Sequence, residues 1–393
     1  MSEQTATQDR TEAIDAAGWG SPVVIWQPHN PAFWLYVGAL VLGVFQFATQ
    51  VVNFSDQLMP AMVSSTILWS LYVLPWAWFI HHKDRFGRET RRLAVIGFVW
   101  GGLIATFLMA LPGNAAMLSI MSKLFDSQFA LAWGPAIVAP LVEESSKGVG
   151  VVMLILLASR HVRTSYDGFI LGAFVGLGFQ VFEDWMYGVG ASGTAFGFDQ
   201  VHNSITTFLG RGLLAGLVSH ALYTALVGAG IGAWVQSRGK PLGARLPGAV
   251  GPIAASLLLH GIWDYAAFSG IQFLGLLTGI SAVILVVMIG RWTNRQLRPW
   301  MSDLLAPEVA TGLITDDELT AMVGSPRDRR HLVHAAKREH GDDAGKATRH
   351  VLHAELDLAE ALGHSAGADS DDVAHARSEL QRLRAALEVT LNA

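Results

Sequence analysis

The chain has 393 residues, of which 51% are hydrophobic and only 15% are charged, and its formal net charge is −5. Soluble domains average about 25% charged residues, so this composition excludes an ordinary soluble domain and predicts an integral membrane protein with a soluble portion. The sequence contains no cysteine, which excludes disulfides, thiolate nucleophiles and cysteine-ligated metals.

The chain begins with a polar, acidic segment that contains Glu3, Asp9, Glu12 and Asp15. This segment lacks the basic region that opens a cleaved signal peptide. We therefore expect the first apolar span to stay in the mature protein.

Eight apolar stretches are long enough to cross a bilayer, for which about 20 residues are needed. They cover residues 32–53, 61–80, 93–112, 129–157, 167–187, 211–235, 248–267 and 270–290. Pro135 and Pro140 in the fourth stretch predict a kink or a short leading helix there. We therefore expect an all-α fold, a polytopic membrane helix bundle of about eight transmembrane helices with a soluble helical C-terminal tail.

The lysines and arginines of the connecting loops predict the orientation of the bundle. Thirteen lie in one set of loops, namely Lys83, Arg85, Arg88, Arg91, Arg92, Arg160, Arg163, Arg238, Lys240, Arg245, Arg291, Arg295 and Arg298. The opposite set holds only Lys123, with Arg211 at the edge of a span. This bias predicts a multi-pass protein of the cell membrane with a cytoplasmic N-terminal tail (1–31), a transmembrane core (32–290) and a cytoplasmic helical C-terminal region (291–393).

Beyond residue 291 the composition becomes charged and rich in alanine and leucine, as in a soluble helical region. Thr315 and Glu318 have the spacing of a capping box that opens a short helix. One apolar stripe at helical spacing lies near the end of the chain and consists of Ala376, Leu380, Leu383, Leu387 and Leu391. We interpret this region as a solvated helical hairpin or as a docking segment for a cytoplasmic partner.

Four groups of ionisable residues lie inside the apolar spans. They are Glu143-Glu144-x-x-Lys147, then Glu183-Asp184, then His220, and then His260 with Asp264 one helical turn later. An ionisable group at membrane depth costs at least about 2.5–3.5 kcal/mol on insertion scales, so each needs a partner or a function. Glu183 also shares a helical face with Gly172 and Gly176, which predicts close contact with a neighbouring helix.

Each group also has a purely structural interpretation. Glu144 and Lys147 could form a neutralised pair, Glu183 and Asp184 could face headgroups, and Asp264 could be solvated. Either histidine could make one hydrogen bond between helices. Two histidines and five carboxylates in four consecutive spans nevertheless add up to a larger insertion free energy than a scaffold alone would explain. Helical rise places all four groups at depths compatible with one cavity in the outer half of the bilayer.

These residues resemble the motifs of the PrsW-type intramembrane proteases, which belong to the CAAX-protease and bacteriocin-processing superfamily. The motifs, in order on successive spans, are Glu143-Glu144-x-x-Lys147, Phe179-x-x-x-Glu183, His220 and His260-x-x-x-Asp264. The resemblance covers about residues 30–290, so it implies a protease-like core and leaves the tail outside. The family often has asparagine after the second-motif glutamate, where this chain has Asp184.

The resemblance implies hydrolysis of a peptide bond inside the membrane. We expect Glu143 to act as the general base and Glu144 to pair with Lys147, although these two glutamates could exchange roles. Glu183, His220 and His260 would form the metal or oxyanion side of the site, with Asp264 behind His260. Two imidazoles and a carboxylate suit a catalytic zinc ion, but the chain has no H-E-x-x-H motif, so metal-dependent and glutamate-type catalysis both remain open.

The resemblance also implies a substrate class. The expected substrate is a single-span membrane protein, such as an anti-sigma factor in regulated proteolysis, cut near the extracytoplasmic side of the bilayer. We expect no nucleic-acid partner.

Two other functions compete with the protease. The first is an ion or proton transporter in which the same intramembrane carboxylates and histidines form a relay, although the chain shows no convincing internal repeat of the kind common in transporters. The second is a catalytically silent membrane scaffold of the same superfamily. The intact set of motif residues argues against the scaffold.

Overall fold

The computed structural model describes residues 8, 10–14, 23–83, 91–215, 220–296 and 298–392. All regular elements in these residues are helices, so the predicted all-α fold is confirmed for the described chain. The chain divides into two compact units. The membrane unit contains the described residues from Val23 to Thr293, and the terminal unit contains the described residues before Pro22 together with those from Asn294 onward.

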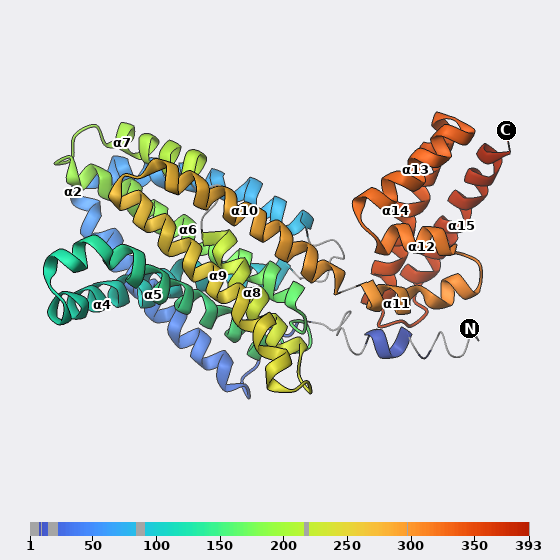
Figure 1. The fold of residues 1–393 in the computed structure, drawn as a ribbon, viewed down its shortest axis with the longest axis horizontal. Coiled ribbons are helices and arrows are strands. Elements are labelled where there is room, and N and C mark those ends of the chain that lie inside the picture. Colours follow the sequence, from blue (N-terminus) through green and yellow to red (C-terminus); the bar gives the residue numbers. More distant parts are fainter. Residues whose placement is uncertain are drawn as a thin grey trace. The chain divides into compact units, whose positions relative to one another are not determined.

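The first two predicted spans lie in one long helix, α2 (Pro31–Lys83). Leu58 interrupts this helix, with backbone angles of φ −119° and ψ 24°. The two apolar halves on either side of Leu58 correspond to the predicted spans 32–53 and 61–80, and α2 changes direction between them (Figure 1).

The described residues of the remaining predicted spans also fall on helices, and residues 216–219 of the predicted span 211–235 lie outside the described residues. These elements are α3 (Arg91–Val99), the π-helical segment η1 (Trp100–Ala110), α4 (Leu111–Leu124), α5 (Ser127–Leu157), α6 (Ser165–Thr194), α7 (Gln200–Thr207), the π-helical segment η2 (Phe208–Ala215), α8 (His220–Gln236), α9 (Leu242–Ser269) and α10 (Gln272–Arg295). α5 contains both Pro135 and Pro140 and continues through them as a single helix, so the predicted short leading helix is wrong.

Five helical stretches of the described chain are long and apolar enough to cross a membrane, which supports a multi-pass membrane protein. The predicted number of about eight is not confirmed. Two predicted spans merge in α2, and the charged residues of α5 lower its hydropathy. The described part of α8 is only 17 residues long.

The closest helix packing in the membrane unit joins α6 to α8. A Cβ atom added to Gly172 would lie 2.3 Å from the carbonyl oxygen of Thr224, and one added to Gly176 would lie 2.2 Å from that of His220. The two backbones therefore touch, as the glycine stripe of α6 predicts. This contact holds Glu183, on the same face of α6, next to the start of α8.

The terminal unit is built from five short helices and a piece of the N-terminal segment. The helices are α11 (Arg298–Ala310), α12 (Asp316–Val323), α13 (Pro326–His340), α14 (Asp342–His364) and α15 (Asp371–Leu391). Thr315 and Glu318 form the predicted capping box. Leu380 and Leu387 of the predicted stripe on α15 are buried.

Arg10, near the N-terminus, docks onto α11. Its guanidinium donates hydrogen bonds to the carbonyl oxygen of Leu304 and to Glu308, both at 2.8 Å. The N-terminal segment is therefore not a free tail over residues 10–14, because it packs with the C-terminal helices.

Glu355 is a fully buried acid of the terminal unit. Arg384 donates one hydrogen bond to Glu355 at 3.3 Å and a shorter one to Glu318 at 2.7 Å. Burial, with a smaller contribution from the negative charge of Glu318, raises the pKa of Glu355 to about 9. Burial alone would also raise the pKa of Glu318, but hydrogen bonds from Arg384 and Thr315 hold it below its usual range.

We expect the stability of the terminal unit to fall as the pH rises from about 4.5 to about 9, because the folded state holds the Glu355 proton over this range and the unfolded chain does not. Glu355→Gln should remove this dependence. The measurement is the rate of tryptic cleavage within α13–α15 of the full chain at about pH 6 and about pH 8.5. Glu360→Gln, an exposed acid on the same helix, should behave like the wild type. An identical pH response in Glu355→Gln would contradict the assignment.

Gly172→Ala should force α6 and α8 apart, because its methyl group would meet the Thr224 carbonyl oxygen. Overpacking of this kind costs about 1–3 kcal/mol, so the midpoint of thermal unfolding in detergent should drop. Gly190→Ala is the matched control on α6, because a Cβ there meets nothing within 4 Å. That control should be neutral or slightly stabilising, since alanine favours a helix by up to about 1 kcal/mol. Equal midpoints for the two variants would show that the α6–α8 contact is not tight.

Candidate active site

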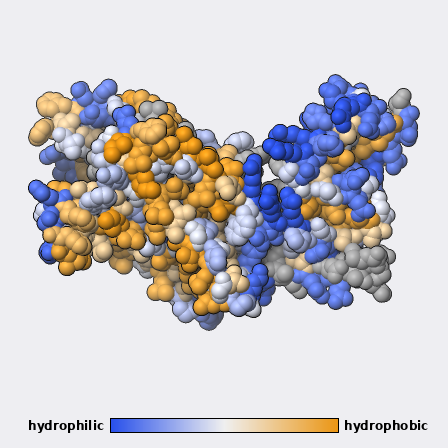
Figure 2. Space-filling view, in the orientation of Figure 1, coloured by the Kyte–Doolittle hydropathy of each residue, from blue (hydrophilic) through white to orange (hydrophobic). Residues whose placement is uncertain are grey.

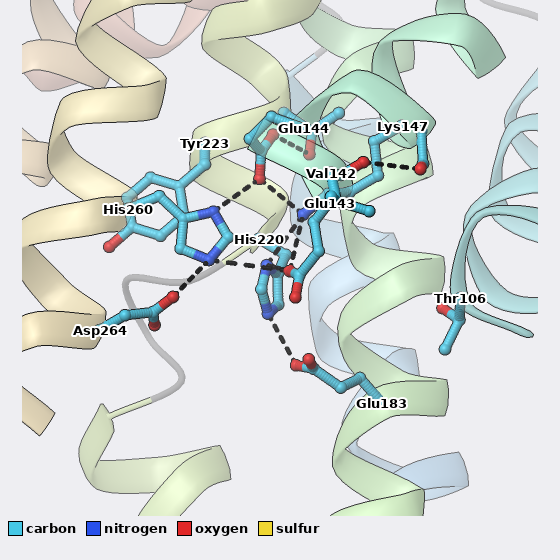
Figure 3. Close-up of polar contacts among 12 residues, drawn as sticks. Thr106, Val142, Glu143, Glu144, Lys147, Glu183, His220, Tyr223, His260 and Asp264 are labelled. Atoms are coloured by element: carbon cyan, nitrogen blue, oxygen red, sulfur yellow. Dashed lines mark hydrogen bonds and ion pairs between the residues drawn. The ribbon is translucent and has the colours of Figure 1, made fainter. Parts of the chain in front are cut away.

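A cavity of about 930 Å³ lies among the helices that carry the predicted site residues. The ionisable residues that line it are Glu143, Glu183, Asp184, Arg211, His220, His260 and Asp264. The structure therefore brings together carboxylates and imidazoles from α5, α6, α8 and α9. Glu144 and Lys147 are adjacent to this group but lie outside the cavity lining of the described chain (Figure 3).

Helical spacing and one interhelical hydrogen bond position these side chains. Glu143 and Lys147 stand four residues apart on α5, and His260 and Asp264 stand four apart on α9, so each pair shares a helical face. The hydroxyl of Ser256, one turn before His260, donates to the carbonyl oxygen of Tyr223 at 2.8 Å and ties α9 to α8.

Lys147 is the central cation of the buried network. Its ammonium group donates to Glu144 Oε1 at 2.6 Å and to His220 Nδ1 at 3.0 Å, and it lies 4.1 Å from the centre of the Phe179 ring. Lys147 is fully buried, so an unpaired charge here would be very costly. Thr224 Oγ1 also donates to the Glu144 carboxylate, at 3.1 Å. Glu144 and Lys147 therefore satisfy one another and orient the histidines.

Glu143 differs from Glu144 in having one free oxygen. Its Oε1 accepts a hydrogen bond from Asn114 Nδ2 at 3.0 Å, whereas its buried Oε2 has no hydrogen-bond partner among the described residues. Oε2 lies 3.8 Å from His220 Nδ1 and 3.7 Å from His260 Nε2. A buried carboxylate oxygen without a hydrogen-bond partner needs an explanation, and a bound ion or water is the usual one. Glu143 Oε2 and the two imidazoles thus surround one point that a ligand would occupy.

The hydrogen-bond partners assign the tautomer of His220. An ammonium group only donates, so His220 Nδ1 is the acceptor from Lys147 and Nε2–H donates to Glu183 Oε2 at 2.8 Å. His260 Nδ1–H donates to Glu144 Oε1 at 3.0 Å, and its Nε2 faces Glu143 and Asp264. Each ring thus has a carboxylate on the nitrogen that points away from Glu143: Glu183 on His220 Nε2 and Glu144 on His260 Nδ1. We call these the outer nitrogens and the other two the inner nitrogens. A carboxylate in this position orients histidine ligands in metal sites.

The structure brings the ligand atoms of Glu143, His220 and His260 within 4.8 Å of one another, and all three residues are buried. In a tetrahedral zinc site with bonds of about 2.0–2.1 Å, ligand atoms lie about 3.3–3.5 Å apart. The two distances from Glu143 Oε2 to the histidine nitrogens, 3.7 and 3.8 Å, are close to this value, and all three pairs lie within 4.8 Å. The residues therefore fit a divalent metal, provided that His220 Nδ1 gives up the hydrogen bond that it accepts from Lys147. Glu183, which we expected in the ligand set, lies instead against Nε2 of His220, whereas the ligand atoms that converge among the described residues are those of Glu143, His220 and His260.

Arg211 is a site residue that the sequence analysis did not select. It extends from η2 and donates to Glu183 Oε2 at 3.2 Å and to the carboxylate of Asp184. Its guanidinium also lies 3.8 Å from the centre of the Tyr187 ring. Its position at the edge of a predicted span, on the side whose loops otherwise hold only Lys123, was the available signal. Arg211 forms ion pairs with both adjacent acids of α6 and so gives the buried Asp184 a charged partner.

Tyr223 and Thr224 were also missed, although they follow His220 by three and four residues and so share its helical face. The Tyr223 ring stacks on His260 with centroids 5.0 Å apart. The Tyr223 hydroxyl is buried, and no described residue accepts or donates a hydrogen bond to it. A hydroxyl in this state, in a residue that lines the cavity, is free to bind a ligand.

A family model described as "PrsW family intramembrane metalloprotease" matches residues 89–291, just over half of the chain. The matched range contains all the ionisable residues of the cavity and confirms the resemblance drawn from the motifs. No curated protein and no solved structure matches the chain. The match favours the protease over the transporter and the silent scaffold. The chain belongs to the PrsW family and is a multi-pass intramembrane protease.

Proposed function

We propose that Glu143, His220 and His260 hold a zinc ion and that the cavity around them hydrolyses a peptide bond of a membrane-spanning protein. The observation that carries this proposal is the convergence of three ligand atoms around the unpartnered Oε2 of Glu143. A zinc ion supplies an activated water near neutral pH and polarises a carbonyl group. This proposal makes Glu143 a ligand rather than the general base expected from the motifs.

The remaining residues have distinct roles in this proposal. Glu144 and Glu183 fix the two imidazole rings through the hydrogen bonds on their outer nitrogens, and Lys147 compensates the charge of the α5 carboxylates. They are positioning residues, since none of these side chains needs to touch the substrate.

Asp264 is the carboxylate best placed to move protons. It lines the cavity, and its Oδ2 lies 3.4 Å from His260 Nε2. Asp264 would accept a proton from the attacking water and pass it to the nitrogen of the departing amine. The free hydroxyl of Tyr223 would donate a hydrogen bond to the carbonyl oxygen as negative charge develops there.

The depth of the site supports cleavage near the extracytoplasmic side. His260 lies nine residues before the end of α9 at Ser269, and Glu183 lies eleven before the end of α6 at Thr194. At about 1.5 Å per residue these positions are roughly 14–17 Å from the helix ends. The basic loops lie at the opposite ends, and basic loops favour the cytoplasm. Both termini would then be cytoplasmic, and a single-span protein such as an anti-sigma factor would be a suitable substrate.

Glu143→Gln should lose both bound zinc and cleavage of a single-span reporter, because the neutral amide is a poor ligand. Glu183→Gln should keep the ligand set and lose only about 10–100-fold in metal affinity or activity, as expected for a residue that orients a ligand. The measurements are zinc per chain by elemental analysis and reporter cleavage in proteoliposomes. If Glu143→Gln retains full zinc while losing activity, Glu143 is the base rather than a ligand.

Cleavage should occur in the half of the reporter span nearer the extracytoplasmic side. Mass spectrometry of both reporter fragments identifies the broken bond, and a reporter inserted with known orientation gives its depth. A bond cut in the cytoplasmic half would contradict the proposed orientation. Removal of zinc by a chelator should abolish cleavage, and zinc added back should restore it.

A further inference from the structure

A second cavity lies between the end of α9 and the first half of α10, within the membrane unit. It is a groove of about 770 Å³ with apolar walls, formed by Trp263, Ala266 and Ala267 on one side and by α10 from Gln272 to Ile284 on the other. Trp263 and Ala267 also line the catalytic cavity. The groove therefore adjoins the proposed site without an intervening helix.

α10 comes close to neighbouring helices at two points, on either side of the exposed groove residues. At one end Gly275 approaches Ala266, where an added Cβ would lie 3.7 Å from the alanine methyl. At the other end Gly290 faces the Phe169 ring of α6, with a corresponding distance of 3.4 Å. Between these contacts Ile280 and Ile284 are 50% and 54% exposed. Figure 2 shows hydrophobic side chains gathered over α9 and α10.

The α10 side of the groove carries small residues that leave room for a second helix. Gly275 and Gly279 stand one turn apart and both line the groove. Small residues at this spacing let the backbone of a second membrane helix approach closely. Gln272, at the start of α10, and the indole N–H of Trp263 are the polar side-chain groups among the groove residues of the described chain. An apolar helix would therefore meet apolar side chains and glycines over the rest of the groove.

We propose that this groove binds the transmembrane helix of the substrate and directs its extracytoplasmic end into the catalytic cavity. The inference rests on the proposed function, since it concerns the substrate of the same site. Hydrolysis requires an unwound peptide, and non-helical backbone is tolerated at membrane depth only where it lines a polar cavity or is buried in protein. The helical part of the substrate stays in the apolar groove. The unwound part reaches the free hydroxyl of Tyr223 and the free oxygen of Asn114.

Ile280→Trp tests the proposal by filling the groove. Leu277→Trp is the matched control, because Leu277 is 45% exposed on the same helix and lies outside the groove lining of the described chain. Ile280→Trp should lower kcat/KM for a single-span reporter by at least about tenfold, the size expected for blocking an apolar subsite. Leu277→Trp should cleave the reporter at the wild-type rate. Equal rates for Ile280→Trp and the wild type would overturn the proposal and would indicate that lipid alone fills the groove.

Disulfide cross-linking gives a readout that does not depend on turnover. Because the sequence contains no cysteine, only the introduced cysteines can react. Ile280→Cys and Leu277→Cys are each combined with Glu143→Gln and mixed with a reporter that carries one cysteine in its span. A disulfide to position 280 and none to position 277 is the expected result. Equal cross-linking at both positions, or none at either, overturns the groove proposal while wild-type cleavage of the same reporter leaves the proposed function intact. Failure of the wild type to cleave any reporter overturns both.

Discussion

The direct contact between the backbones of α6 and α8 is the constraint on which the site depends. Gly172 and Gly176 leave no room for a side chain between the two helices. This contact sets the 2.8 Å distance between Glu183 on α6 and His220 on α8. A larger residue on the stripe would move His220 away from Glu183 and from the carboxylates of α5 together. The glycines thus have a functional consequence although they take no part in chemistry.

The second requirement is charge compensation at membrane depth. Lys147 is fully buried, and its ammonium group contacts Glu144 at 2.6 Å and Glu143 at 3.8 Å. Removing one member of a buried ion pair typically costs 3–5 kcal/mol, because the other charge is left uncompensated. Arg211 acts in the same way toward Glu183 and Asp184. Each cation therefore allows a cluster of acids to remain where a metal or a substrate carbonyl can use them.

Much of this organisation follows from the sequence. Hydrophobic stretches located the helices, and helical spacing identified the glycine face of α6, the capping box at Thr315 and the buried stripe of α15. The motif order selected the residues of the cavity. Periodicity shows on which face of a helix a residue lies. The family resemblance then indicates which helix faces line the same site.

Other features depend on geometry that periodicity does not encode. Whether Glu143 or Glu183 meets the inner nitrogens of the histidines depends on helix rotation and side-chain rotamers, so the ligand set expected from the motifs differed from the one that converges. The number of spans is not confirmed, because the sequence does not show that the two apolar halves on either side of Leu58 join in one continuous helix. The docking of Arg10 on Glu308 joins residues 298 positions apart, and no local pattern indicates such a contact.

X-ray absorption spectroscopy at the zinc edge, on the full chain in detergent, tests the central claim most directly. Coordination by Glu143, His220 and His260 predicts two imidazole groups and light oxygen or nitrogen ligands at about 2.0–2.1 Å. It also predicts that the imidazole signal falls to one group in His260→Ala. A spectrum with no imidazole contribution, or one unchanged by His260→Ala, would contradict the convergence of these residues on a single metal.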